Sequence, residues 1–155
     1  MNNIYDNNEF FAAYAEMRRS KDGLKSAGEW HQLQPLFPEL QEKKVLDLGC
    51  GYVWHCKYAA QMGATEILGI DSSEKMIAKA ATDNSDDKIK YEICSVEEYI
   101  YPESAYDLVV SNLVLHYIED YAQPLLTLNN NSFFKISPPA YEAPEVIWLR
   151  GSCDY

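Results

Sequence analysis

The stretch Lys44-Val45-Leu46-Asp47-Leu48-Gly49-Cys50-Gly51 decides the fold, because a short apolar run passes directly into a glycine turn. Val45, Leu46 and Leu48 are typical of a strand that is covered on both faces. Gly49 and Gly51 allow the chain to turn without a Cβ clash. The stretch therefore predicts a buried strand that ends in a tight turn.

A helix is expected directly after this turn. Trp54, Tyr58, Ala59 and Met62 recur at helical spacing, and Gly63 stands where a left-handed helix end favours glycine. A strand, a glycine turn and a helix in succession leave backbone N–H groups free at the helix N-terminus. An anion or a carboxylate can bind there.

A second strand, Glu66 to Ile70, ends at Asp71. The separation of Gly49 and Asp71 is near the roughly twenty residues that place an acidic side chain on a ribose. Asp71 and the segment that follows it also fit a simpler role, the N-cap of the next helix. We favour the ribose contact, which makes this unit a nucleoside-binding βαβ unit.

Composition and charge limit the classes of function. The 155 residues suffice for one domain, and the formal net charge of −11 disfavours nucleic acids and anionic membranes as partners. No apolar run approaches the roughly eighteen residues of a membrane span, and the N-terminus has no signal-peptide pattern. Four cysteines without C-x-x-C spacing are typical of reduced thiols. We expect a cytoplasmic protein, and we expect no metal site, since the neighbours His55 and Cys56 point in different directions on a helix.

The glycine turn distinguishes between nucleotides. A dinucleotide fingerprint requires a small residue three positions after Gly51, where this chain has Trp54. The glycine turn instead resembles the first motif of class I S-adenosylmethionine-dependent methyltransferases, in which an acidic residue and one spacer precede G-x-G-x-G. The matching segment is Asp47-Leu48-Gly49-Cys50-Gly51-Tyr52-Val53. It departs from the motif only at the last glycine, which is Val53 here. Within that superfamily, residues 10–128 are similar to the small-molecule "type 11" methyltransferase domain.

The resemblance implies an α/β fold with a Rossmann-like, doubly wound and mostly parallel sheet. It divides the chain into an N-terminal helical lid (1–40), a cofactor-binding α/β core (41–128) and an atypical tail (129–155). Further strands are expected over 89–94 and 106–112. No strand pair of suitable length is expected in the tail, so the domain would be truncated after its fourth strand. That strand would then be an exposed edge unless residues 146–149 cover it.

The segment before the central strand offers several open interpretations. Asp6, Asn7 and Asn8 can cap a helix whose apolar face comprises Phe10, Phe11, Tyr14 and Met17. This helix either only packs on the domain or, as the resemblance implies, closes over the cofactor. The basic residues Arg18, Arg19, Lys21 and Lys25 form either a solvated surface or a clamp for a substrate carboxylate. Ser26 and Glu29 have capping-box spacing, and Trp30 is either core or a wall of the substrate pocket.

The resemblance implies S-adenosylmethionine as the cofactor. Asp71 would hold the ribose, Ser95 and Val96 the adenine, and Tyr14 and Met17 would lie on the lid side. The expected cofactor-binding residues are Tyr14, Met17, Asp47, Gly49, Cys50, Gly51, Asp71, Ser72, Met76, Ser95, Val96, Ser111 and Asn112.

His116, after the fourth strand, is the candidate catalytic residue. Its side chain would orient or deprotonate a methyl acceptor, since an ordinary imidazole pKa near 6.5 suits a general base; the alternative is a buried structural histidine. Three functions remain open: methyl transfer to a small molecule, a truncated relative with weak or no cofactor binding, and an NAD(P)-dependent oxidoreductase. The oligomeric state does not follow from the sequence.

Overall fold

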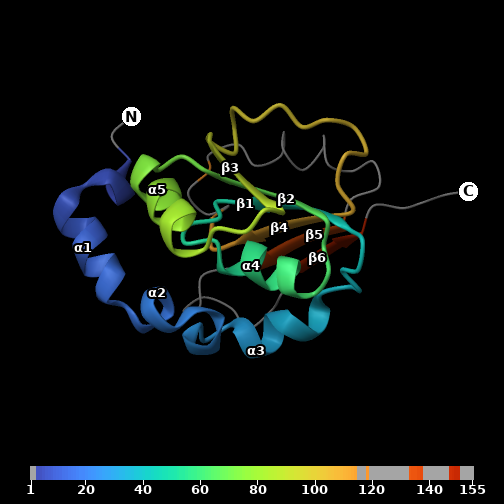
Figure 1. Cartoon of the computed structure of the whole chain (residues 1–155), viewed down its shortest axis with the longest axis horizontal. Helices are drawn as coiled ribbons and strands as arrows, with labels where there is room; N and C mark the ends of the chain where they lie inside the picture. The colour runs from blue at the N-terminus through green and yellow to red at the C-terminus, as the bar shows by residue number, and fades with distance from the viewer. Residues whose placement is uncertain (1–2, 115–117, 119–132, 138–146, 151–155) are drawn as a thin grey trace, which may run out of the picture.

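A computed structural model describes residues 3–114, 118, 133–137 and 147–150. Six strands form one sheet in the order β3-β2-β1-β4-β5-β6 (Figure 1). Their bounds are Lys44–Leu48 for β1, Glu66–Asp71 for β2, Ile89–Ile93 for β3, Leu108–Asn112 for β4, Phe133–Ser137 for β5 and Ile147–Arg150 for β6. Strands β1 to β5 run parallel, and β6 is antiparallel to β5. The α/β fold with a mostly parallel sheet is thus confirmed.

The order of the strands places a topological switch point beside β1. The chain passes from β1 to β2 through α4 (Trp54–Gln61) and from β2 to β3 through α5 (Glu74–Asp83), and it then returns across the sheet to β4. Strand β1 therefore pairs with β2 on one side and with β4 on the other. Ligands of such sheets bind at the carboxyl ends of the strands next to this reversal.

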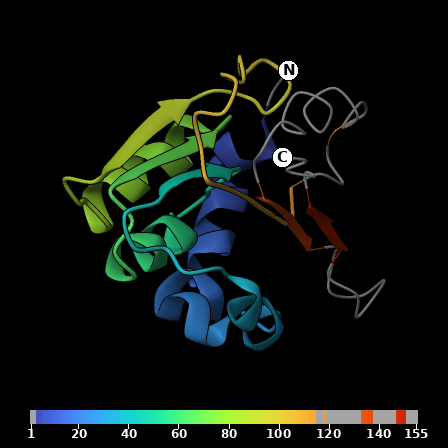
Figure 2. The ribbon, with the colours of Figure 1, turned by 90° about the vertical axis from the view of Figure 1, so that its right-hand side faces the viewer.

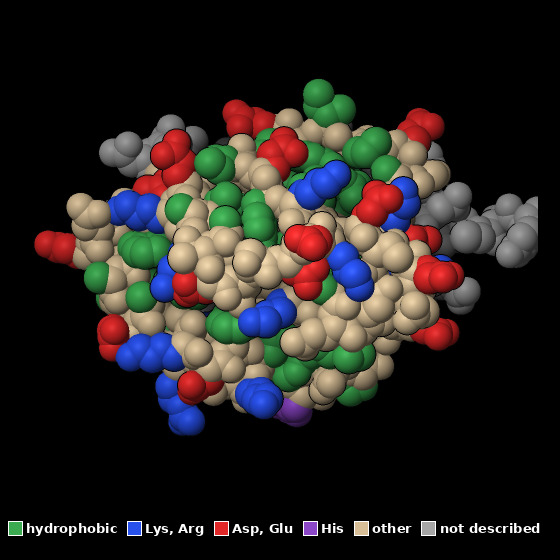
Figure 3. Space-filling view, in the orientation of Figure 1, with side chains coloured by type: hydrophobic (Ala, Val, Ile, Leu, Met, Phe, Trp, Pro, Cys, Tyr) green, Lys and Arg blue, Asp and Glu red, His purple; other side chains and the backbone are tan. Residues whose placement is uncertain are grey.

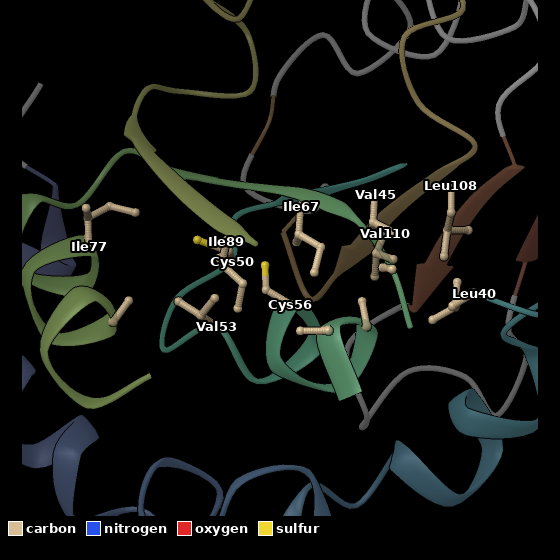
Figure 4. Packing of buried hydrophobic residues seen from close by; sticks show 14 residues of the cluster. Leu40, Val45, Cys50, Val53, Cys56, Ile67, Ile77, Ile89, Leu108 and Val110 are labelled. Carbon is tan, nitrogen blue, oxygen red and sulfur yellow. The ribbon is translucent and has the colours of Figure 1, made fainter. Parts of the chain in front are cut away.

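The core has two parts, one on each face of the sheet. Between the sheet and helices α4 and α5, a cluster includes Val45, Cys56, Ile67 and Val110 (Figure 4). On the opposite face, the buried residues are Leu46, Leu48, Ile70, Val96, Val109 and Ile118, with tyrosines of the 99–106 segment packed against them. Because successive residues of β1 and β4 enter opposite clusters, both strands are buried at nearly every position.

The N-terminal segment is helical and lies beyond α4 and α5 (Figures 1 and 2). It comprises η1 (Ile4–Asp6), α1 (Asn8–Glu16), α2 (Arg18–Asp22), η2 (Gly23–Ser26), α3 (Trp30–Leu33) and η3 (Gln34–Leu36). Asn7 caps α1 by accepting from the backbone N–H groups of Glu9 and Phe10. η1 contacts α5, and η2 contacts α4, so the segment follows the helical layer rather than the sheet.

Two local predictions in this segment are wrong. Met17 does not continue the first helix, because its extended backbone, with a ψ of 144°, separates α1 from α2. Residues 18–26 are helical, whereas a polar linker was expected there. Ser26 and Glu29 form no capping box. The Ser26 hydroxyl donates to Asp22, and the Glu29 carboxylate pairs with Arg19 instead of the backbone N–H of Ser26, because an ion pair of a partly buried carboxylate is stronger than a cap hydrogen bond.

The tail also differs from the expectation. Two strands follow residue 128, where no strand pair was expected: β5 occupies the place beside β4, and β6 lies outside it. The backbone of β4 is therefore paired on both sides. Residues 147–149, within the segment proposed as a cover for β4, pair with β5 instead.

The described surface carries acidic and basic side chains close to one another, as Figure 3 shows for one face. Within the residues that the structure describes, helices are all too short or too polar to cross a membrane.

Candidate functional site

The glycine turn joins β1 to α4 at the carboxyl edge of the sheet. Gly49 and Gly51 have φ angles of +65° and +51°, which glycine adopts without steric cost. A Cβ at Gly49 would clash with the side chain of Val114, whereas a Cβ at Gly51 would meet no atom within 4 Å. The turn is therefore packed at its first glycine and open at its second, where a ligand can approach the backbone.

Val53 ends this turn in an unusual conformation. Its φ of 69° and ψ of 23° are left-handed, and its side chain is fully buried (Figure 4). A β-branched residue in this region costs about 1–3 kcal/mol, which glycine would avoid. The last glycine of the methyltransferase motif thus corresponds to a real backbone requirement, which Val53 meets under strain.

Asp71 lies at the end of β2 and faces the glycine turn. One carboxylate oxygen accepts from the backbone N–H of Gly51 at 2.9 Å, and the other accepts from the backbone N–H of Ser73, also at 2.9 Å. Burial raises the pKa of Asp71, while these two N–H donors act in the opposite direction. Each oxygen retains a lone pair, so the carboxylate can accept further hydrogen bonds from a diol.

Asp47 is buried below the same turn and is 1% exposed. The Cys56 thiol donates to its Oδ2 at 3.4 Å, and Nδ1 of His55 lies 3.9 Å from that oxygen. Burial raises the pKa of Asp47 to about 7, and the Cys56 hydrogen bond only partly offsets this. The group is thus poised to ionise when a cation comes near.

The start of the chain contacts the segment after Asp71. Asp6 accepts from the Ser73 hydroxyl at 2.6 Å and from the backbone N–H of Lys75 at 3.2 Å. Asn3 donates to the Ser72 hydroxyl at 2.9 Å. The ring of Tyr14 packs edge-on against Tyr52 of the glycine turn, with centroids 5.6 Å apart. The N-terminal segment therefore lies against both β-to-α connections of the site.

Residues after β3 complete this edge of the sheet. The Cys94 backbone N–H donates to the Asp71 carbonyl at 3.0 Å, which fixes the next residues beside the carboxylate. Val96 is buried and Ser95 is partly buried; the Ser95 hydroxyl accepts from the backbone N–H of Glu98 at 3.2 Å. Ser95 therefore caps a turn and keeps Val96 in the core.

At the end of β4, the Asn112 amide donates to Oε1 of Glu29 at 2.9 Å, and Arg19 donates to the same oxygen at 2.8 Å. Burial alone would raise the pKa of Glu29, but hydrogen bonds and the Arg19 charge together lower it. Among the described residues, Oδ1 of Asn112 and the buried hydroxyl of Ser111 have no hydrogen-bond partner. Two buried polar atoms at the switch point therefore lack a partner within the part of the chain that is described.

A cavity of about 60 Å³ lies between the glycine turn and the N-terminal segment. Its lining residues are Arg19, Gly23, Leu24, Ala27, Gly49, Cys50, Trp54, His55 and Asn112. The cavity is thus bordered by the turn after β1, the end of β4 and the start of α4. The free backbone N–H groups at the start of α4 favour negative charge.

The structure does not bring every predicted residue to one surface. Asp47, Gly49, Cys50, Gly51, Asp71, Ser95, Val96, Ser111 and Asn112 lie at or directly after the carboxyl ends of β1 to β4. Ser72 is exposed and Met76 is buried in α5, while Met17 is 48% exposed at the break after α1. His116 lies outside the described residues. In the part of the chain that is described, no three His, Cys, Asp or Glu side chains are grouped to hold a metal ion.

Sequence reasoning missed three residues that shape the site. Asp6 contributes through contacts 67 and 69 residues away along the chain, and the Glu29–Asn112 contact spans 83 residues. Arg19 belongs to a run of basic residues, and nothing in that run distinguishes it from Arg18, Lys21 or Lys25. No periodic pattern indicates such contacts, although the proximity of Asp6 to a predicted lid helix was a weak signal.

The glycine turn, the acidic end of β2 and the polar end of β4, on a sheet with this switch point, together define a nucleoside-binding domain of the class I methyltransferase fold. A family model described as "Methyltransferase domain" matches residues 46–129, more than half of the chain. The chain belongs to this methyltransferase family.

Known relatives agree with this assignment. An S-adenosylmethionine dependent methyltransferase from Mesorhizobium loti is 34% identical with a TM-score of 0.70, covering 83% of this chain and 66% of that one. A Listeria monocytogenes structure, described as a candidate enzyme of the same kind, is 38% identical with a TM-score of 0.68 and covers 76% and 58%. An uncharacterized Haemophilus influenzae protein is 32% identical over 84% of this chain and 55% of its own length. The chain therefore spans about half to two thirds of these relatives.

Proposed function

We propose that the protein binds S-adenosylmethionine and transfers its methyl group to a small-molecule acceptor. The observation that carries this proposal is the Asp71 carboxylate, held by the N–H groups of Gly51 and Ser73 at the switch point. S-adenosylmethionine is the expected cofactor of the family. An NAD(P)-dependent oxidoreductase is not favoured, because the family match is to methyltransferases and Trp54 stands where a dinucleotide site needs a small residue.

The residues present fit this cofactor. Asp71 would accept from the ribose hydroxyls, and the open face of Gly51 would let the nucleoside approach the backbone. Ser95 and Val96, beside Asp71, would border the adenine. The methionine end would lie beside the glycine turn, which borders the cavity at Gly49 and covers the buried Asp47 carboxyl. Residues 3–40 would act as a lid through Asp6 and Tyr14.

The bound cofactor would supply an electrophilic methyl group on a sulfonium centre. The chain's own contribution is then mainly positional: it aligns donor and acceptor, which can account for about 7–11 kcal/mol of a barrier. If the lid closes on the cofactor, the Tyr14 ring would stabilise the sulfonium by roughly 0.5–2 kcal/mol. We assign His116 the role of orienting or deprotonating the acceptor.

The negative net charge of the chain supports a small-molecule acceptor over a nucleic acid. The net charge of −11 repels phosphate backbones, which would weaken binding of a nucleic acid substrate. A relative from Deinococcus radiodurans, 33% identical over 62% of this chain, is a trans-aconitate 2-methyltransferase. Other relatives act on tRNA or on protein arginine, and they match half of the chain or less. We also propose a cytoplasmic location.

Isothermal titration with S-adenosylhomocysteine tests the proposal. We expect wild-type binding in the micromolar range and an Asp71→Ala variant weakened by about 1.5–3 kcal/mol, the usual value of hydrogen bonds to a charged group. Asp83→Asn, on the exposed end of α5, is the control and should bind like wild type. A folded wild-type chain that gives no heat would support the alternative of an impaired relative. Unchanged affinity in Asp71→Ala would limit Asp71 to a structural role, its hydrogen bonds to Gly51 and Ser73, since the N-cap of α5 is Ser73.

A further inference from the structure

A second hollow, of about 360 Å³, lies on the N-terminal segment next to the cavity. Its lining residues are Arg18, Lys25, Ser26, Ala27, Gly28, Trp30 and His31, which we call the basic groove. Three of these side chains are basic and none is acidic. In a chain with a net charge of −11, such a set opposes the overall field and creates a local site for anions.

The two strongest cations of the groove are available for binding. Lys25 is exposed and forms no ion pair with any described residue. Arg18 is 87% exposed and lies 4.0 Å from Asp22, a loose pair that contributes little in water. Asp22, which also accepts from Ser26, is the acidic side chain that competes for these cations. Figure 3 shows a histidine beside basic side chains at the lower edge of the molecule, over the region of α2 and α3.

The basic groove adjoins the cavity of the cofactor site. Ala27 lines both spaces. Arg18 lines the groove and its neighbour Arg19 lines the cavity. The ring of Trp30, a groove wall, contacts His55, a cavity wall, with centroids 5.9 Å apart. A small molecule held in the groove can therefore extend past Ala27 toward the glycine turn.

We propose that the basic groove binds an anionic group of the methyl acceptor, a carboxylate or a phosphate. This inference rests on the proposed function and adds the chemical class of its substrate. The Arg18 guanidinium presents paired N–H donors that match a carboxylate or phosphate, Lys25 adds a point charge, and the His31 ring adds an N–H donor. The acceptor's nucleophilic atom then lies on the side of Ala27 that faces the cavity.

Titration of the full chain with citrate and with inorganic phosphate, in the presence of S-adenosylhomocysteine, tests the groove; glycerol is the neutral probe. We expect saturable binding of an anion and none of glycerol. The double variant Arg18→Gln with Lys25→Gln should weaken anion binding at least tenfold. The matched control, Lys88→Gln with Lys90→Gln, makes the same charge change on exposed side chains at β3 and should stay within twofold. Asp22→Asn should tighten binding two- to threefold.

The pattern of results identifies the anion and separates the two proposals. Tighter binding of citrate assigns a carboxylate, and tighter binding of phosphate assigns a phosphate. Equal anion affinity in the two double variants, or no saturable anion binding, overturns the groove while S-adenosylhomocysteine binding still supports methyl transfer. If a folded wild-type chain binds no S-adenosylhomocysteine, the proposed function fails and the assignment of an acceptor fails with it.

Discussion

Two regions meet at the site, and they are held in different ways. The β1–α4–β2 unit is positioned by local geometry, with Gly49, Gly51 and Asp71 all within one continuous stretch. The N-terminal segment is positioned by polar contacts across long sequence separations, from Asp6 to Ser73 and from Glu29 to Asn112. We infer that the first region is rigid in backbone conformation, whereas the second depends on a few replaceable side chains.

The largest effect is expected in the rigid region. Gly49→Ala should lower the free energy of unfolding by about 2–5 kcal/mol, because a positive φ and a clash with Val114 both oppose the new Cβ. Gly28→Ala is the matched control, since its Cβ would meet nothing within 4 Å. Urea denaturation measures both variants; equal stability would show that the turn adapts and is not rigid.

Asp47 should give this region a characteristic pH dependence. Its pKa is about 7 in the folded state and near 3.8 in an unfolded chain, so the unfolded state loses its proton first as the pH rises. Stability should therefore fall by a few kcal/mol between about pH 4 and 7 and then level off. Asp47→Asn should reduce this slope and leave the part due to Asp71, whose pKa burial also raises. A wild-type melting temperature that does not change across that range would contradict the raised pKa.

In the N-terminal segment, Glu29→Ala should destabilise the fold by about 2 kcal/mol, because Arg19 and Asn112 lose their shared acceptor. Since the pKa of Glu29 is lowered, its contribution is present at neutral pH and is lost as the pH falls below about 4.5. Glu16→Ala, which removes an exposed pair with Lys21, should change stability by less than about 0.5 kcal/mol. Similar losses in both variants would mean that the Glu29 contacts are not special.

The smallest effect concerns Val53 and comes from two opposing contributions. Val53→Gly relieves the left-handed strain but loses a buried side chain, so its net change should be within about 1 kcal/mol. Val53→Ala keeps the strain and loses most of the packing. We expect Gly to be more stable than Ala by about 1 kcal/mol, measured by chemical denaturation. We also expect Val53→Gly to bind S-adenosylhomocysteine more tightly than the wild type. A Val53→Ala variant that is more stable than Val53→Gly would contradict the backbone strain at this position.

The difference between the regions also explains what the sequence could predict. The central strand, the glycine turn and Asp71 follow from short-range spacing, and the structure has them where they were expected. The Glu29 contacts do not follow from any spacing, and a capping-box pattern even suggested another role. The tail strands Phe133–Ser137 and Ile147–Arg150 were not expected, because the segment after residue 128 departs from the family's pattern of a basic residue, a proline and paired glycines. Their pairing depends on the open side of β4, which only the assembled sheet provides.

The most direct test of the account is hydrogen exchange with and without S-adenosylhomocysteine. We expect slower exchange on binding in two places together, at residues 49–53 with 71–76 and at residues 3–17. Protection of both would show that the cofactor binds at the switch point and that the N-terminal segment closes on it. Protection confined to other strands, or none at a saturating concentration, would contradict the central claim that these two regions form one cofactor site.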